Sequence, residues 1–250
     1  MTPLPDFLRR NNCGTLSQTY LSRLQICVLS PDSDRLCDDR VYQELDILRV
    51  LRLFHRLPSI RTISAGAISY GDVPRFGTDL QSLSSEISAI HMRHVCLSSV
   101  VIAAMIRMPK ALKEFLCTTG CRESLGGGHY VVFPEVVGRS LWCQRRSLTT
   151  LDLDLDQYLT YLAPGDGEQS VSGGAFRTEI AQLKIAEIDT GRDYNSTTGS
   201  LHDFERLSHL SIGIELLSGP KSYREIAVEP APFRLVDALP PSLGHLTIRG

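Results

Sequence analysis

A short phrase of apolar residues, apolar-x-x-apolar-x-apolar, returns along the chain and constrains its fold more than any other feature. The last three residues of each copy place two apolar side chains on one face of a β-strand, because side chains alternate in direction along a strand. The clear copies are Leu21-Leu24-Ile26, Ile60-Ile63-Ala65, Ile87-Ile90-Met92, Leu112-Phe115-Cys117, Leu148-Leu151-Leu153, Leu207-Leu210-Ile212 and Leu243-Leu246-Ile248, and a weaker one is Ile180-Leu183-Ile185.

Helical patterns that end near a proline precede several copies of the phrase. Residues 38–60, DDRVYQELDILRVLRLFHRLPSI, place Val41, Leu45, Leu48 and Leu51 on one helix face, and Pro58 ends the pattern. The recurring order is therefore helix, break, strand.

Three further segments fit the same order. Residues 97–112, LSSVVIAAMIRMPKAL, predict a helix capped by Ser98 or Ser99 that ends before Pro109. Ser200, with Asp203 three positions on, predicts a short helix in GSLHDFERLSHL. Residues 234–246, RLVDALPPSLGHL, predict one helical turn followed by a strand.

The spacing of the phrases leaves room for one helix and one strand in each unit. Steps between successive first positions range from 25 residues (87 to 112) to 39 residues (21 to 60). A strand-helix-strand connection favours parallel neighbours, and stacked units bury each strand against the helices. We therefore predict an α/β solenoid with a parallel sheet on its concave face and helices on its convex face.

The phrases resemble leucine-rich repeats. Three segments, SLTTLDLDLD, GSLHDFERLSHLSIGIELLSGP and FRLVDALPPSLGHLTIRG, resemble a family of fungal leucine-rich-repeat proteins, many of which carry an F-box. The resemblance implies an irregular leucine-rich-repeat solenoid whose strand face binds other proteins. Through the F-box of that family, it also implies a substrate receptor of a cullin-type ubiquitin ligase.

The chain departs from the family pattern in two respects. Positions where the family places a ladder of Asn or Cys hold Leu29, Ile68, Val95 and Gly120. The N-terminal segment LPDFLRRNNCGTL shows no F-box pattern and already reads like repeat material. We predict one leucine-rich-repeat-like domain over residues 1–250, with loop insertions near 119–130, 163–174 and 190–200, where the sequence is polar and rich in glycine.

Composition narrows the setting of the protein. A net charge of −2 and only short, isolated basic pairs argue against nucleic-acid binding. No apolar run reaches membrane-spanning length, and the N-terminus lacks a secretory signal pattern. The seven cysteines are scattered without a C-x-x-C pair, which fits reduced thiols. We expect a cytoplasmic or nuclear protein with no membrane contact.

The segment LTTLDLDLDQYL raises the question of a metal site. Asp152, Asp154 and Asp156 match the start of a calcium loop, but Gln157 stands where the loop needs glycine and Ala163 where it needs glutamate. In an extended strand the outer two carboxylates would stand about 13 Å apart, too far to share one ion. We interpret the segment as a half-buried strand, and we expect no metal or cofactor.

The repeat pattern places the variable residues of the phrases in columns on the exposed side of the sheet. The third positions are Arg23, Thr62, Ala89, Glu114, Thr150, Gln182, His209 and His245, and the fifth positions are Gln25, Ser64, His91, Leu116, Asp152, Lys184, Ser211 and Thr247. Adjacent strands lie about 4.8 Å apart, so His209 and His245 should be neighbours, with Asp152 and Asp154 nearby as an acidic edge.

This surface is the candidate partner-binding site, made of Glu114, Thr150, Asp152, Asp154, His209, Ser211, His245 and Thr247. A metal or pH-sensitive site at the histidines and a solvated face without a particular task are its alternatives. We predict a non-enzymatic scaffold for protein-protein interaction, with ubiquitin-ligase components among its potential partners. The alternative is a small hydrolase-like α/β enzyme, whose mark would be a deep pocket with converging polar residues.

Overall fold

A computed structural model describes residues 26–29, 43–54, 57–69, 83–119, 132–155, 197–219 and 234–249. Within these residues the protein is an α/β structure built around a seven-stranded sheet in which every pair of neighbours is parallel. The order of the strands in space, β1-β3-β5-β6-β7-β8-β9, is their order in the sequence. The strands are β1 (Ile26–Leu29), β3 (Thr62–Gly66), β5 (Ala89–Arg93), β6 (Glu114–Thr118), β7 (Thr150–Asp154), β8 (His209–Gly213) and β9 (His245–Arg249).

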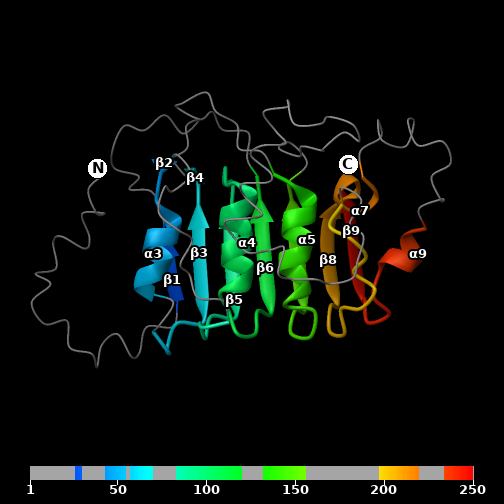
Figure 1. The fold of residues 1–250 in the computed structure, drawn as a ribbon, viewed down its shortest axis with the longest axis horizontal. Coiled ribbons are helices and arrows are strands. Elements are labelled where there is room, and N and C mark those ends of the chain that lie inside the picture. Colours follow the sequence, from blue (N-terminus) through cyan, green and yellow to red (C-terminus); the bar gives the residue numbers. More distant parts are fainter. Residues whose placement is uncertain are drawn as a thin grey trace, which may run out of the picture.

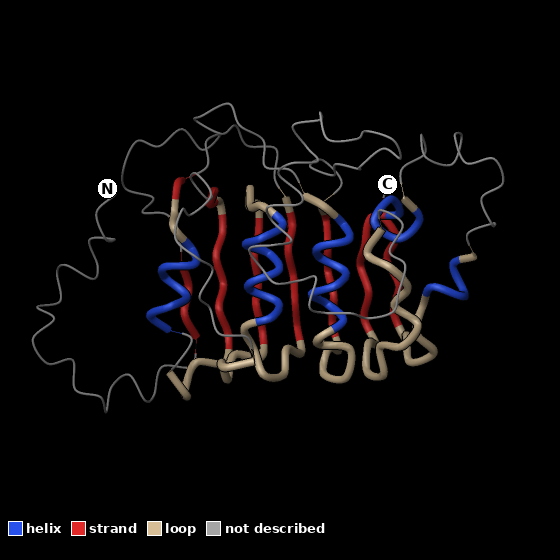
Figure 2. Tube along the Cα trace, viewed as in Figure 1, coloured by secondary structure: helices blue, strands red, loops and turns tan. Residues whose placement is uncertain are grey.

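The longer helices cover one face of this sheet. They are α3 (Ile47–Phe54), α4 (Ser99–Arg107) and α5 (Pro134–Trp142). They lie side by side on this face, with their axes roughly along the strand direction (Figure 1). Two short helices, α7 (Ile214–Ser218) and α9 (Leu235–Ala238), lie near the C-terminal end. The loops that lead into the strands lie together at the end of the sheet where the strands begin, which we call the strand-entry edge (Figure 2).

The core lies between the sheet and the helices and is built from the repeated phrase. The first positions Ile60, Ile87, Leu112, Leu148 and Leu207 are all buried. The fourth and sixth positions of these units, Ile63, Ala65, Ile90, Met92, Phe115, Cys117, Leu151, Leu153, Leu210 and Ile212, are buried as well, and they share one cluster with the apolar residues of α3, α4 and α5. The prediction of an apolar core face is confirmed for these five units.

Strand pairing confirms the predicted columns from β3 to β9. Thr62, Ala89, Glu114, Thr150, His209 and His245 pair in a continuous row, and so do Ser64, His91, Leu116, Asp152, Ser211 and Thr247. Strands β7 and β8 pair directly, so Thr150 stands beside His209 and Asp152 beside Ser211. Residues 180–185 themselves, and with them Gln182 and Lys184, lie outside the described residues.

The predicted position of the first phrase is wrong by three residues. Ile26 pairs with Thr62 and Cys27 with Ile63, so the strand begins where the prediction ended it. The phrase that matches this pairing is Leu24-Cys27-Leu29, which has the same spacing as the predicted Leu21-Leu24-Ile26. Spacing alone could not distinguish the two overlapping copies.

The first predicted helix begins later than expected. Gln43–Glu44 form a short strand, β2, which pairs with β4 (Ile68–Ser69) in a separate two-stranded sheet. Helix α3 begins at Ile47, after Asp46, whose carboxylate accepts a hydrogen bond from N of Arg49 at 2.9 Å. An N-terminal cap therefore sets the start of the helix, and the apolar pattern continues past it toward the N-terminus.

The second predicted helix is confirmed, and the third is not. Helix α4 follows Ser98 as its cap residue and ends before Pro109, as predicted, although the Ser98 side chain makes no capping hydrogen bond. Residues 202–206 form turns instead of the predicted helix. Oγ of Ser200 accepts a hydrogen bond from N of His202 at 3.2 Å, and this local bond replaces the helical cap.

Regular hydrogen bonds join the units at the strand-entry edge. The carbonyl of Arg61, a second phrase residue, accepts hydrogen bonds from N of Ser88 (2.8 Å) and N of Ala89 (3.0 Å). The same pair of bonds recurs at the carbonyls of Ser88, Lys113, Thr149 and Ser208. The hydroxyls of Ser88, Thr149 and Ser208 add a bond to the preceding unit's carbonyl, at 3.4, 2.9 and 3.2 Å. We call this row the hydroxyl ladder.

Buried Gln144 ties the end of α5 to the loop between α4 and β6. Its Oε1 accepts hydrogen bonds from N of Leu112 (3.0 Å) and from Oγ of Ser147 (2.9 Å). Its Nε2 donates to the carbonyls of Ile106 (3.0 Å) and Pro109 (2.9 Å). All four hydrogen-bonding positions of this side-chain amide are thus occupied.

Helix α5, which the sequence analysis did not predict, contacts the segment before β8 at one glycine. A Cβ on Gly138 would lie 2.6 Å from the carbonyl carbon and 2.7 Å from Cα of Thr198. These are backbone atoms that cannot move aside alone. The close approach therefore requires glycine at position 138.

The predicted insertions lie almost wholly outside the described residues, as does Asp156. In the part of the chain that the structure describes, no helix is both long and apolar enough to span a membrane.

Candidate functional site

The side of the sheet opposite the core carries the predicted site residues. We call it the sheet face and define it as the third, fifth and seventh phrase positions of β3, β5, β6, β7, β8 and β9. The eight candidates, Glu114, Thr150, Asp152, Asp154, His209, Ser211, His245 and Thr247, all lie on it. Side-chain alternation puts them there, because on β6, β7 and β8 the apolar residues between them point into the core. On β9 the corresponding residues, Leu246 and Ile248, are 37% and 40% exposed, so the predicted core face is not buried at this strand.

An ion-paired cluster occupies the β7 to β9 end of the sheet face. NH1 of Arg249 lies 3.1 Å from Oδ1 of Asp152 and 3.2 Å from Oδ2 of Asp154. NH2 of Arg249 donates a hydrogen bond to Oδ2 of Asp152 at 3.3 Å. The side chains of the three residues are between a quarter and two-fifths exposed. The acidic edge expected from the sequence is therefore paired with a cation, since one guanidinium contacts both aspartates.

Arg249 reaches Asp154 across the intervening strand because of a glycine. Gly213 of β8 pairs with Arg249, and it follows Ile212, which pairs with Leu153. Gly213 therefore lies between Asp154 and Arg249 and has no side chain to separate them. Sequence analysis missed Arg249 because it stands at the seventh position, one step beyond the phrase, although Asp154 occupies the same position two strands away.

The cluster also encloses polar atoms that lack a well-aligned hydrogen bond. Among the described residues these buried atoms are Oδ1 of Asp152, Oγ of Ser211 and NH1 of Arg249. Oδ1 of Asp152 and NH1 of Arg249 are nonetheless in ion-pair contact. Ser211 lies on β8 and pairs with Asp152 on one side and with Thr247 on the other.

The two predicted histidines are neighbours, as expected. The rings of His209 and His245 have centroids 5.9 Å apart and an interplanar angle of 30°. Nδ1 of His209 lies 2.9 Å from Oγ of Ser208, and Nε2 of His245 lies 3.3 Å from Oγ1 of Thr247. Oγ of Ser208 also lies 3.2 Å from the carbonyl oxygen of Thr149.

The middle of the sheet face carries a contact between an imidazole and a carboxylate. Nε2 of His91 lies 3.2 Å from Oε2 of Glu114 on the next strand. Thr150 lies between Glu114 and His209 in the row of third positions. The surface thus changes in chemistry from strand to strand, whereas the core face of the same strands is uniformly apolar.

Cys117 lies on the core side of the sheet, behind these charges. Complete burial, and secondarily the negative charges of Asp152 and Asp154, raise the pKa of Cys117 to about 12. Its thiol therefore stays protonated at neutral pH, which fits a structural residue.

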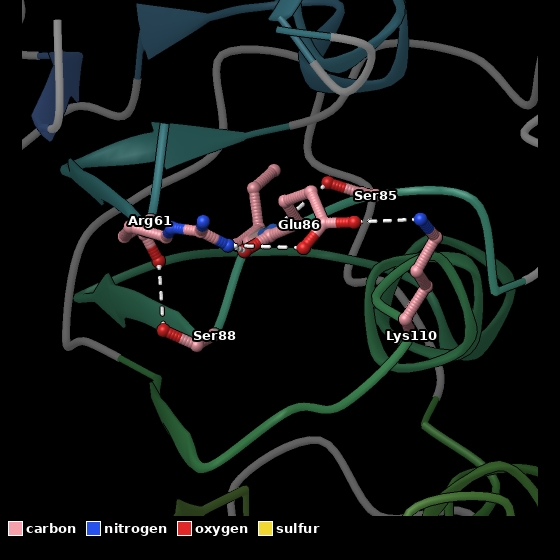
Figure 3. Close-up of polar contacts among 6 residues, drawn as sticks. Arg61, Ser85, Glu86, Ser88 and Lys110 are labelled. Atoms are coloured by element: carbon pink, nitrogen blue, oxygen red, sulfur yellow. Dashed lines mark hydrogen bonds and ion pairs between the residues drawn. The ribbon is translucent and has the colours of Figure 1, made fainter. Parts of the chain in front are cut away.

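A basic rim follows the strand-entry edge beside the sheet face. We define the strand-entry rim as loops 57–61, 83–88, 108–113 and 143–149. In it, Oε2 of Glu86 lies 3.0 Å from NH1 of Arg61, and Oε1 of Glu86 lies 2.6 Å from Nζ of Lys110 (Figure 3). Hydrogen bonds from Lys110 and then from Arg61 lower the pKa of the Glu86 carboxyl. Sequence analysis did not identify this group, because its members come from three different loops.

The described residues contain no group of three or more His, Cys, Asp or Glu side chains arranged to hold a metal ion. Comparisons with family models, curated proteins and solved structures gave no match.

Proposed function

We propose that the chain is an irregular leucine-rich-repeat solenoid that acts as a non-enzymatic scaffold for protein-protein interaction. The observation that supports the proposal is the sheet face. The third and fifth phrase residues of six strands, β3 and β5 to β9, pair in two continuous rows. Helices α3, α4 and α5 cover the other face of the sheet, where the core lies (Figure 1). Stacked repeats bind partners through extended surfaces of this kind.

The chemistry of the two rows also favours recognition over packing. Carboxylates, imidazoles and hydroxyls alternate along the rows, and the residues are half-buried or exposed except for buried Ala89. A partner that lies across the strands would contact a different side chain at each step of about 4.8 Å. Such a surface provides specificity through many weak contacts on a rigid support.

The ubiquitin-ligase context rests on the sequence resemblance alone. In this context the sheet face would bind the substrate, and a separate segment would contact the ligase. Purification of the tagged chain from its native cells addresses both ideas. Recovery of cullin-ligase components supports the ligase context, and recovery of other partners without them argues against it.

The sheet face itself is tested with two matched variants. Thr247→Arg adds a large cation to an exposed fifth position on β9, and Val236→Arg adds the same side chain to α9, where Val236 is 65% exposed. We expect Thr247→Arg to remove specific partners from the purified material and Val236→Arg to retain them. Equal retention by both folded variants would contradict partner binding at the sheet face.

A further inference from the structure

The strand-entry rim concentrates positive charge on a chain whose net charge is −2. Its four loops contain the cations Arg61, Lys110, Lys113, Arg145 and Arg146 and the single anion Glu86, so five positive charges less one negative charge give +4. These loops enter neighbouring strands of the sheet, β3, β5, β6 and β7. Because neighbouring strands stand about 4.8 Å apart, the charge spans about 14 Å.

Hydrogen-bond donors of the rim remain available in the part of the chain that the structure describes. Glu86 engages NH1 of Arg61 and Nζ of Lys110, and no contact occupies Nε or NH2 of Arg61 there. The Lys113 side chain is exposed and has no partner among the described residues. Glu86 thus holds two cations in place without neutralising the group.

The other two cations are more engaged. The guanidinium of Arg145 lies 4.5 Å from the centroid of the Trp142 ring and donates from NH1 to the carbonyl of that residue at 3.2 Å. Arg146 is largely exposed, and its Nε lies 3.4 Å from Oε1 of Glu205. The open part of the rim is therefore the part formed by Arg61, Lys110 and Lys113.

We propose that the strand-entry rim binds an acidic segment of a protein partner. The open cations lie on the loops that enter β3 and β6, two strand steps or about 10 Å apart, so an extended segment of about three residues places carboxylates within reach of Arg61, Lys110 and Lys113. The rim loops contain no Phe, Tyr, Trp or His, so they offer no platform for stacked bases, which single-stranded nucleic acid needs in addition to charge. This surface lies outside the sheet face, so the proposal does not depend on the proposed function.

The test measures fluorescence anisotropy of a labelled oligoglutamate peptide titrated with the full chain. We expect saturable binding at low salt that weakens at an ionic strength of about 1 M, where the Debye length falls to about 3 Å. A labelled oligothymidylate of equal charge is titrated in parallel. Absence of peptide binding at low salt, or equally tight binding of the oligothymidylate, would overturn the proposal.

Three variants locate the binding. Lys113→Gln removes an unpaired rim cation and should weaken peptide binding about two- to fivefold. Glu86→Gln removes the rim's anion and should strengthen binding by a similar factor, which loss of structure would not do. Arg49→Gln is the matched control, because Arg49 is exposed on α3 and belongs to neither the rim nor the sheet face.

Circular dichroism and thermal unfolding establish that each variant is folded. Equal effects of Lys113→Gln and Arg49→Gln would show that the peptide senses only the net charge of the chain. That result would contradict a site at the rim, as would weaker binding by folded Glu86→Gln.

Discussion

NH1 of Arg249 lies 3.2 Å from Oδ2 of Asp154, although β8 separates the strands that carry the two residues. The same guanidinium contacts Asp152, so a single side chain joins the last strand to the third strand from the end. This contact explains why two aspartates can stand on the sheet face without forming a free anionic surface.

Replacement of Arg249 should weaken the attachment of β9. We expect Arg249→Ala to lower the free energy of unfolding by about 1 kcal/mol, a modest value because the cluster is partly exposed and screened by water. Urea denaturation at low and high salt measures the effect, which should shrink at high salt. Gly213→Leu should mimic the loss by placing a side chain between Asp154 and Arg249, and Arg93→Ala should have little effect.

Truncation of a leucine on the core face should lower the free energy of unfolding in proportion to how deeply that leucine is buried. Leu151 and Leu246 allow the comparison, because both stand in the row of fourth phrase positions. Leu151→Ala should cost about 2–5 kcal/mol, because Leu151 is fully buried. Leu246→Ala removes the same atoms from the same row, but Leu246 is 37% exposed, and we expect a loss of about 1 kcal/mol. Chemical denaturation compares them, and equal losses would contradict the burial difference between β7 and β9.

Gln144 should be essential to the packing of α5. Gln144→Leu would leave N of Leu112 and the carbonyls of Ile106 and Pro109 without their partners, so we expect a loss of about 3 kcal/mol or more. Ser147→Ala removes only one of the four bonds and should cost about 1 kcal/mol. A loss for Gln144→Leu no greater than that for Ser147→Ala would show that other groups replace the amide.

Gly138→Ala should destabilise the protein despite the better helix propensity of alanine. Propensity favours the change by about 1 kcal/mol, but the new methyl group would overlap the backbone of Thr198, at a cost of about 3 kcal/mol. Thermal unfolding gives the sign of the net effect. Because the overlap is with backbone atoms, Thr198→Gly should not rescue Gly138→Ala, and a rescue would show that the Thr198 side chain causes the conflict.

Cys117 should make stability depend on pH in the alkaline range. An unfolded thiol has a pKa near 8.5, and the pKa of Cys117 in the folded protein is about 12. Above the unfolded value the native state holds more protons, so its stability should fall as the pH rises from about 9 toward 12. Urea denaturation at a series of pH values should show this fall in the wild type, and Cys117→Ala should show less of it.

Prediction from sequence succeeded where the alternation of apolar residues fits only one alignment of the phrase. Alternating apolar residues assigned Leu151 and Leu153 to the core and Asp152 to the sheet face, and the pairing of Asp152 with Leu116 follows from aligning the phrases. The same method failed at Cys27, because two overlapping phrases fit the N-terminal sequence equally well. Only the pairing with Ile63 distinguishes them.

The repeated phrase does not predict side-chain contacts between different units. The bridge from Arg249 to Asp152 depends on the size of Gly213, and the group around Glu86 depends on three loops that the fold brings together. Helix α5 did carry local signals, with Pro134 in its first turn and Val136, Val137 and Leu141 on its buried side. No helix was predicted there, because these residues follow the glycine-rich segment 119–130, whose composition indicates a loop.

The hydrogen bonds at the strand-entry loops all run in one direction along the sheet. From β5 to β9, each strand-entry loop donates backbone hydrogen bonds to a carbonyl of the unit before it. The hydroxyl ladder adds a bond only where the second phrase position holds serine or threonine. Because backbone atoms form the joint, the same pair of hydrogen bonds is accepted whether that position holds Arg61, Lys113 or Ser208.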